Sequence, residues 1–511
     1  MIPSLHPTKP FNTRGSMKKI ILSFILLMTP MVLFSQGLPH TFQNGEVIDA
    51  TKFNENFEYL LKRTAIHKTT VDCSAGETIN DALEKFNHIV ISGTCNENIE
   101  IDASVNPQKM LILEGASGNA GNDKIVASNS DNATVHISFP VYVKIENLTL
   151  SNGKRGIQLQ DGVFANVKKC IIENNFYDGI GAWTQTTLIV EESTIHNNGL
   201  SNDWGSGVSV WDVTLGVINS NIQNHPYGKA IRLSNSQGWI MENNFTGPYK
   251  HEAIQVEKGA VAYIGDKPDD DGQSRGNTIT GPFETGVSVR ENSHARFMAN
   301  TITGYKNTGI RVSRNSSAEI GTDWDRDTYT IGQRMDYGNT LNGTALTGQT
   351  VDDWQWGIQV SESSTVQLHR NMIEYHQRGG VHAQELSVIE LGGGNIVQNN
   401  THTESDGDIR GTGFEIRGGS SLDMSDWDQE HEPNTISGNG RTAFRADGGI
   451  LNLRGGSIWE NDILISKTNK LIISGHQRGI TAGRKSTVTL QRVEIKDNSK
   501  TGIDLYDGSN L

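Results

Sequence analysis

Apolar and polar residues alternate in short runs along most of the chain, and these runs return at a regular interval. The stretch from Gly286 to Val312 shows the unit: a small residue, two apolar residues flanking a polar one, an Asn-Thr-Ile turn, and glycine again. From Gly286 to Gly309 the unit takes 23 positions. Alternation over so few residues predicts short strands rather than helices, and repetition at this period predicts one coil of stacked turns.

A small residue opens each of the later turns. These openings are Gly156, Gly179, Gly207, Ala230, Ala253, Gly286, Gly309, Gly357, Gly380, Gly413, Ala443, Gly479 and Gly502. Six of the intervals equal 23, and alanine takes the position three times. We therefore expect close packing at a corner rather than a need for positive φ. The longer interval between Ala443 and Gly479 predicts a short extra turn around Ile463 and Ile465.

Asparagines gather at the turn beside another apolar strand of each unit. They include Asn174, Asn197, Asn300, Asn371 and Asn434. Asparagine tolerates left-handed backbone, and its amide can bond to the same group one turn along. This structural role is favoured over contact with a ligand.

The chain divides into three segments. Residues 1–35 carry Met17-Lys18-Lys19 before the apolar run from Ile20 to Phe34, which has the form of a secretory signal. We expect a secreted or cell-surface protein with no membrane span in the mature chain, an uncleaved anchor being the alternative. Residues 36–70 predict a spacer with a short amphipathic helix, or an oligomerising stalk, and resemble a leader module of secreted bacterial proteins. Residues 71–511 hold the repeat, and we expect its last turn to be incomplete.

The first turn of the coil has an open sheet edge and an open core, which a covering helix would protect. The segment from Glu77 to Phe86 predicts this helix, with Ile79, Ala82 and Leu83 on one side. Cys73 and Cys95 are 22 residues apart, about one turn of the repeat, so an oxidising compartment predicts a disulfide between them. We expect Cys170 to be a small buried residue rather than a reactive thiol.

The net charge of −14 over 511 residues limits the classes of partner that the protein is expected to bind. It argues against nucleic acid or an anionic membrane surface as the main partner. It is compatible with neutral sugars, with cationic groups, or with anionic sugars held through calcium.

Equivalent positions of stacked strands form rows along the outside of the coil. Row A is the polar residue between two apolar ones: Gln158, Gly181, Ser209, Arg232, Gln255, Ser288, Arg311, Gln359, His382, Glu415 and Arg445. Row B lies two positions later: Gln160, Trp183, Trp211, Ser234, Glu257, Arg290, Ser313, Ser361, Gln384, Arg417 and Asp447. Both rows are expected to face solvent on one sheet.

Charged members of the two rows are the candidates for chemistry. Arg311, His382 and Glu415 are the candidate catalytic residues, because Glu415 follows His382 by one turn and could orient its imidazole. The candidate substrate-binding residues are Arg232, Glu257, Arg290, Arg417, Trp183 and Trp211. The two tryptophans suit stacking on sugar rings. The alternatives are a solvated belt of alternating charges and, for the indoles, packing under the loop from Gly199 to Ser206.

Three long insertions carry carboxylates. In one of them, Asp323, Asp325 and Asp327 supply the oxygens that calcium prefers, but the glycine and distal glutamate of a calcium-binding hand loop are missing. A solvated acidic loop is the alternative to a calcium site.

The repeat resembles the right-handed parallel β-helix of the pectin-lyase-like superfamily over roughly residues 71–511. This resemblance implies an all-β solenoid, a right-handed single-stranded parallel β-helix, to which the helix predicted above adds an N-terminal cap. Members include lyases, hydrolases, epimerases, adhesins and phage spikes, and polysaccharide usually lies along such a sheet. Enzyme signatures are missing: Ser474-Gly475-His476 is followed by Gln477, and Glu494-Ile495-Lys496 stands where polygalacturonases carry Arg-Ile-Lys. We expect extracellular polysaccharide binding without turnover. The alternatives are a lyase or hydrolase of an acidic glycan, and a trimeric fibre or spike.

Overall fold

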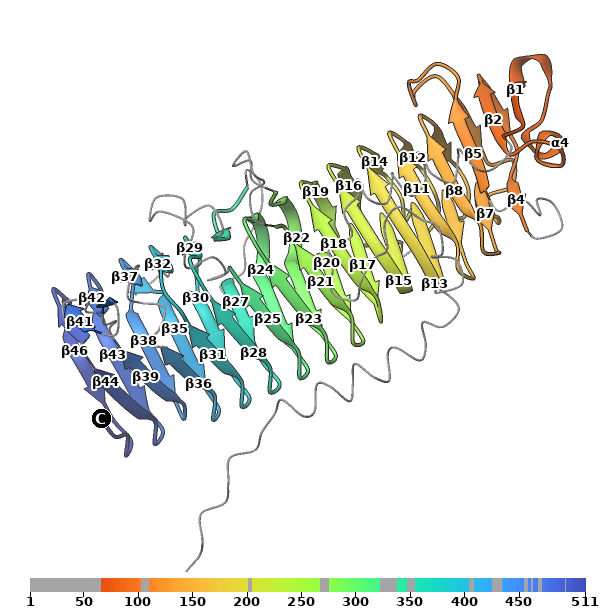
Figure 1. Cartoon of the computed structure of the whole chain (residues 1–511). Helices are drawn as coiled ribbons and strands as arrows, with labels where there is room; N and C mark the ends of the chain where they lie inside the picture. Colours follow the sequence, from red (N-terminus) through yellow and green to blue (C-terminus); the bar gives the residue numbers. More distant parts are fainter. Residues whose placement is uncertain are drawn as a thin grey trace, which may run out of the picture. The chain divides into compact units, whose positions relative to one another are not determined.

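The computed structural model describes residues 66–102, 110–200, 205–266, 275–321, 338–346, 354–403, 409–424, 434–454, 458–460, 463–466, 471–491 and 493–511. The signal segment 1–35 and most of the spacer lie outside these residues. Ile66–Leu511 forms one unit, in which successive turns of strands follow one another from β1 to β46 (Figure 1).

Each turn of the coil contributes a strand to each of three walls. Wall 1 holds β4 (Ile99–Ile101), β7 (Val135–Ile137), β10 (Ile157–Leu159), the first half of β13 (Ile180–Glu191) and of β15 (Val208–Ile218), β17 (Ile231–Ser234), β20 (Glu252–Glu257), the second half of β22 (Thr278–Arg290) and of β24 (Thr301–Ser313), β27 (Trp356–Val360), β30 (Gly379–Ala383), β35 (Thr412–Arg417), β38 (Thr442–Asp447), β43 (Arg478–Gly483) and β46 (Thr501–Leu505). Wall 2 holds β1 (Lys68–Asp72), β2 (His88–Ser92), β5 (Met110–Gly115), β8 (Tyr142–Glu146), β11 (Phe164–Lys168), the second half of β13 and of β15, β18 (Gln237–Met241), β21 (Val261–Ile264), β23 (His294–Phe297), β25 (Ser317–Ile320), β28 (Thr365–Leu368), β31 (Val388–Leu391), β36 (Ser421–Met424), β39 (Ile450–Arg454) and β44 (Thr487–Gln491). Wall 3 holds β3 (Thr94–Asn96), β6 (Lys124–Val126), β9 (Thr149–Ser151), β12 (Ile171–Glu173), β14 (Thr194–His196), β16 (Asn221–His225), β19 (Asn244–Tyr249), the first half of β22 and of β24, β26 (Thr340–Asn342), β29 (Met372–Glu374), β32 (Ile396–Gln398), β37 (Thr435–Ser437), β42 (Leu471–Ser474) and β45 (Val493–Lys496).

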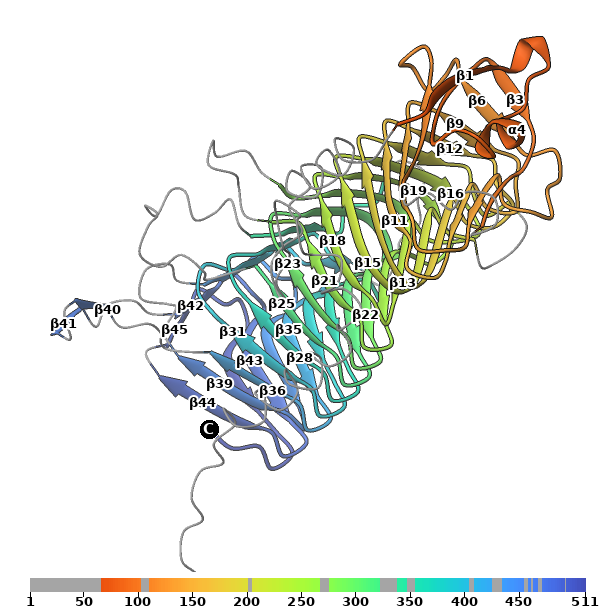
Figure 2. The same cartoon turned by 45° about the vertical axis from the view of Figure 1, so that its right-hand side comes forward.

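Strands within a wall are parallel, and each pairs with its equivalents in the turns before and after it. The apolar residues that flank each polar one point inward: Ile310 and Val312 have no exposed surface. Burial of one such side chain stabilises the fold by about 1.5–3 kcal/mol. The alternation read from the sequence therefore builds one continuous hydrophobic core. Figure 2 shows the turns of strands that enclose it, stacked along the coil.

Corner glycines are required by close packing, as predicted. A Cβ atom on Gly179 would lie 2.7 Å from the carbonyl oxygen of Gly207 and 2.7 Å from the side chain of Ile195. The same crowding occurs at Gly286, where a Cβ would lie 2.5 Å from the carbonyl oxygen of Gly309. Neither glycine has a positive φ, so space rather than conformation selects the residue.

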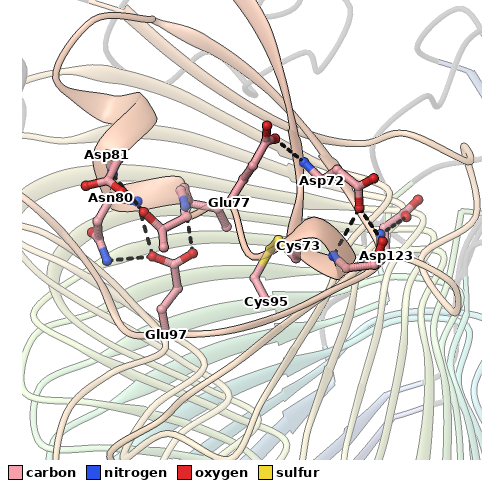
Figure 3. The surroundings of a disulfide bond; sticks show 12 residues. Asp72, Cys73, Glu77, Asn80, Asp81, Cys95, Glu97 and Asp123 are labelled. Atoms are coloured by element: carbon pink, nitrogen blue, oxygen red, sulfur yellow. Dashed lines mark hydrogen bonds between the residues drawn. A yellow bond between two sulfur atoms is a disulfide. The ribbon is translucent and has the colours of Figure 1, made fainter.

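The N-terminal end of the coil is covered by α4 (Ile79–Leu83), the α-helix of the described residues, which is shorter than the expected segment from Glu77 to Phe86. Its first backbone N–H groups are satisfied by Glu97, whose carboxylate accepts from the N–H of Ile79 at 2.7 Å and of Asn80 at 3.1 Å (Figure 3). No helix among the described residues has the length and apolar character to cross a membrane.

Beside this helix a disulfide joins η1 (Cys73–Ala75), a 3-10 turn, to β3 (Figure 3). Its partners are Cys73 and Cys95, the pair proposed from the sequence, with Cα atoms 5.1 Å apart. The third cysteine, Cys170, is buried, and burial raises the pKa of its thiol to about 12.

An asparagine ladder runs inside the coil at one corner. Its members are Asn243, Asn277, Asn300, Asn339, Asn371, Asn395 and Asn434. Each amide accepts from the backbone N–H and the side chain of the preceding member, as Asn300 does from Asn277 at 3.0 and 2.8 Å. Asn174 and Asn197 belong instead to left-handed turn positions, with φ of 57° and 53°.

The prediction of an extra turn between Ala443 and Gly479 is wrong. Thr442 pairs directly with Arg478, so the flanking turns are neighbours. Between β39 on wall 2 and β42 on wall 3, the strands β40 (Ile458–Glu460) and β41 (Ile463–Ser466) form a separate antiparallel hairpin. A second antiparallel pair, β33 (His402–Thr403) and β34 (Ile409–Arg410), lies in another connection.

Replacing Asn300 with alanine should lower the free energy of unfolding by about 3 kcal/mol or more, because several buried amide groups lose their partners. Asn174→Ala is the matched control and should cost about 1–2 kcal/mol, since it affects only a left-handed turn residue. Urea unfolding followed by circular dichroism measures both variants. Equal losses would contradict the role given to the ladder.

Candidate functional site

Row A lies on wall 1 in unbroken register from Gln158 to Arg445. Row B runs beside it, with direct pairing from Trp183 to Glu257 and from Arg417 to Asp447. The 23-residue period thus brings together side chains that are far apart in sequence.

Several members of the rows do not face solvent as expected. Glu257 and Glu415 are each 1 % exposed and His382 is 6 % exposed. The reason is that a wall of parallel strands places side chains about 4.8 Å apart, so long arginines extend over the shorter groups beside them. Both buried carboxylates are thus covered by arginine side chains.

Clamp 1 consists of Arg232, Glu257 and Arg290 on three consecutive turns. Glu257 Oε1 accepts from Arg232 Nε at 2.8 Å and Nη2 at 2.7 Å, and Oε2 accepts from Arg290 Nη2 at 2.8 Å. Ser234 and Gln255 donate to the same carboxylate. Burial alone would raise the pKa of Glu257, but the hydrogen bonds from Arg290, Ser234 and Arg232 outweigh it and lower the pKa to about 2.

Clamp 2 consists of Arg417, Glu415 and Arg445. Glu415 Oε1 forms ion pairs with Arg417 Nη2 and, at 3.2 Å, with Arg445 Nη1. Arg378 lies near enough for the charges of Glu415, Arg417 and Arg445 to act on it, and burial lowers the pKa of its guanidinium. Two guanidiniums therefore pair with one buried carboxylate, and the charge of Arg378 acts on it from nearby.

Arg311 lies on row A between the two clamps. Its Nε donates to Gln359 Oε1 at 3.2 Å, and burial lowers the pKa of its guanidinium. Within the part of the chain that the structure describes, no carboxylate forms an ion pair with it. This distinguishes it from the arginines of both clamps.

The candidate triad of Arg311, His382 and Glu415 is not assembled as an acid–base unit. Gln359 separates Arg311 from His382 by one turn on row A. Glu415 follows His382 on the next turn, but its carboxylate is held by arginines. Neither imidazole nitrogen of His382 has a hydrogen-bond partner among the described residues. The geometry lacks a carboxylate orienting the imidazole.

His382 is instead packed as an aromatic ring. It stacks on Trp356 with ring centroids 4.7 Å apart. Burial lowers the pKa of its imidazole to about 4, against the opposing charge of Glu415. At neutral pH the ring is uncharged, with both nitrogens buried at a cost of about 1–3 kcal/mol for each unsatisfied group.

The two tryptophans of row B are direct neighbours. The Trp183 ring lies over Gly181, where a Cβ atom would come within 2.3 Å of the indole. The guanidinium carbon of Arg155 lies 4.7 Å from the centre of the same ring. Trp211 is 43 % exposed, with Lys258 Nζ 4.5 Å from its ring. An exposed indole next to a cation suits both ring stacking and contact with a charged substituent.

The sequence reasoning missed Trp354, Trp356 and Arg378. Trp354 is 63 % exposed and its ring lies 4.4 Å from the Arg378 guanidinium. Trp356 occupies the space above Gly379, its partner one turn later. The signal that could have found Trp356 was its position three residues before row A, opposite a glycine.

The expected calcium ligands Asp323, Asp325 and Asp327 lie outside the described residues. Where the structure describes the chain, no group of three or more His, Cys, Asp or Glu side chains is arranged to hold a metal ion.

A family model described as "Right handed beta helix region" matches residues 87–246, 267–426 and 356–511, which is most of the chain. The chain belongs to this family. It is a right-handed parallel β-helix, as the repeat predicted. A search of curated proteins finds no match.

Solved structures with similar folds share little sequence with this β-helix. An alginate lyase from Paenibacillus sp. is 12 % identical over 64 % of this chain and 94 % of its own, with a TM-score of 0.26. A periplasmic alginate epimerase mutant is 11 % identical over all of both chains, with a TM-score of 0.33. An α-1,3-glucanase from Streptomyces thermodiastaticus is 11 % identical over 88 % of this chain and 70 % of its own, with a TM-score of 0.30.

Glu257→Gln should destabilise the β-helix by about 3 kcal/mol, because Arg232 and Arg290 lose the buried charge that they share. Glu291→Gln is the control: Glu291 pairs at 2.7 Å with the exposed Arg314, and its loss should change stability by no more than about 0.5 kcal/mol. Urea unfolding at neutral pH measures both. A Glu257 variant as stable as the control would contradict the clamp.

His382→Phe should raise stability by about 1 kcal/mol at pH 7, since an apolar ring replaces two unsatisfied nitrogens. The gain should grow as pH falls from about 6.5 to about 4. In that window the unfolded histidine binds a proton that the folded one, with its pKa lowered to about 4, does not. Thermal unfolding of both proteins across this range measures the difference, and a gain that shrinks on acidification would contradict a buried neutral imidazole.

Proposed function

We propose that the protein binds an anionic polysaccharide along wall 1 and does not cleave it. The observation that supports this most is the state of the two buried carboxylates. Each is occupied by arginines, and the pKa of Glu257 is lowered to about 2. Such groups orient guanidiniums instead of moving protons, and an oriented guanidinium is suited to carboxylate or sulfate groups.

Hydrolysis by these carboxylates is disfavoured on geometry. Glycoside hydrolysis uses two carboxyl groups about 5–9.5 Å apart, one of which must be protonated. Glu257 and Glu415 lie five turns apart on wall 1, which is about 24 Å at about 4.8 Å per turn. Neither can assist the other.

A lyase is the second candidate, and Arg311 favours it. A desolvated guanidinium with a lowered pKa and a neutral partner could neutralise or abstract at an acidic sugar. The missing enzyme signatures of the sequence weigh against this alternative.

We place the interaction outside the cytoplasm. Two observations support this. The apolar run from Ile20 to Phe34 follows two lysines, as in a secretory signal. The Cys73–Cys95 disulfide is a bond typical of oxidising compartments.

Binding of the full chain to alginate, polygalacturonate and a neutral glucan tests the proposal, by calorimetry at several salt concentrations. We expect binding to the two acidic polymers that weakens with salt. Arg290→Gln should weaken it at least tenfold, or by about 1.4 kcal/mol or more. The control Arg296→Gln removes an arginine of wall 2 that pairs with Glu319, and should bind like the unaltered protein.

The same incubations reveal cleavage, with and without calcium. An unsaturated product that absorbs in the ultraviolet, and that Arg311→Ala no longer releases, would show that the protein is a lyase and would contradict binding without cleavage. Binding confined to the neutral glucan, or binding that Arg290→Gln leaves unchanged, would contradict the proposal.

A further inference from the structure

The two clamps hold their arginines in fixed positions with donors left over. A guanidinium has five N–H donors. Arg232 and Arg290 each use Nε and Nη2 on Glu257. The Nη1 edge of each makes no further hydrogen bond among the described residues. Side-chain exposures of 25 % for Arg232 and 30 % for Arg290 show that both reach solvent.

Clamp 2 lies further along wall 1 and is held by ion pairs, with Arg417 on the same strand as Glu415 and Arg445 on the next turn. Glu415 Oε1 and Arg417 Nε have no hydrogen-bond partner among the described residues. Arg417 and Arg445 share Glu415, with side-chain exposures of 31 % and 24 %. Since the shared carboxylate already fixes these long side chains, an arriving anion orders fewer rotamers. Each clamp is therefore a preorganised pair of guanidinium groups.

The clamps lie on one straight wall with a fixed spacing. Glu257 and Glu415 are five turns apart, or about 24 Å. Arg311 lies between them, two turns after Glu257. Parallel pairing of every intervening strand keeps this distance constant, so a ligand must match it.

We propose that the ligand is an extended polyanionic glycan that occupies both clamps at once, so that its affinity depends on the length of its charged chain. The inference rests on the proposed function and names the ligand class of the same surface. Once one clamp is occupied, a chain long enough to reach the other binds it as an intramolecular step, whereas a shorter chain cannot.

Trp211 beside clamp 1 favours a polyanion with rings that can stack on an indole over one without rings. Trp211 pairs with Ser234, whose hydroxyl donates to Glu257. Its exposed indole is thus continuous with the clamp and offers a flat apolar face to a sugar ring.

The test is a series of oligogalacturonates of increasing length, titrated into the full chain by calorimetry. We expect affinity to rise about 100-fold or more once the extended chain exceeds about 24 Å. Arg290→Gln and Arg445→Gln, each altering a different clamp, should each remove most of this rise while binding short chains with at most about tenfold loss. Each variant retains one arginine on its buried carboxylate, and circular dichroism verifies folding. Arg290→Lys, which keeps the charge without the fork, should show an intermediate rise.

The outcomes are distinguishable. If no acidic glycan of any length binds, the proposed function fails. If long and short chains bind equally, or the rise survives in both glutamine variants, binding stands and the two-clamp inference is overturned. Single-stranded DNA binding with the same length dependence and greater affinity would assign the clamps to nucleic acid and overturn the glycan. Retention of the rise in Arg296→Gln, with its loss in the clamp variants, supports the inference.

Discussion

Parallel pairing between successive turns is the constraint on which the rest of this structure depends. Because each strand pairs with its equivalent one turn away, every residue has nearly the same kind of neighbour about 4.8 Å along the coil. Inward positions become continuous columns of Ile, Val and Leu. Corner positions become ladders such as that of Asn277, Asn300 and Asn339, where one amide satisfies the next.

The same constraint creates a difficulty on the outside, where like charges on successive turns would repel. Clamp 1 resolves it by placing the buried Glu257 between arginines of the turns before and after it, and in clamp 2 the buried Glu415 pairs with Arg417 of its own strand and Arg445 of the next turn. In clamp 1 the hydrogen bonds to Glu257 outweigh its desolvation, since the pKa falls to about 2 despite burial. The carboxylate stays ionised across the physiological pH range and keeps two guanidiniums together that would otherwise separate.

Much of this could be predicted from the sequence, because the period of 23 residues fixes which positions stack. It predicted that Arg311, His382 and Glu415 share a row, and that Trp183 and Trp211 are neighbours. It did not predict that Glu257 and His382 are buried, because burial depends on which way neighbouring long side chains extend. Apolar alternation also could not separate an extra turn from the hairpin of β40 and β41, since both are short strands. Trp356 was missed because it lies outside the alternating core of its turn.

The acidity of the chain and an anionic ligand are compatible for a reason of distance. A net charge of −14 opposes a polyanion at long range, but at physiological ionic strength charges more than about 8 Å apart are largely screened. Contacts at a clamp are made within hydrogen-bond distance. There the local excess of guanidinium groups over carboxylates makes the interaction with an anion attractive. Each clamp has two arginines for one carboxylate, and Arg378 adds a third cation near clamp 2. The proposed attraction is therefore local to the clamps, because over the whole of wall 1 carboxylates such as Glu252, Glu284 and Asp447 balance the arginines.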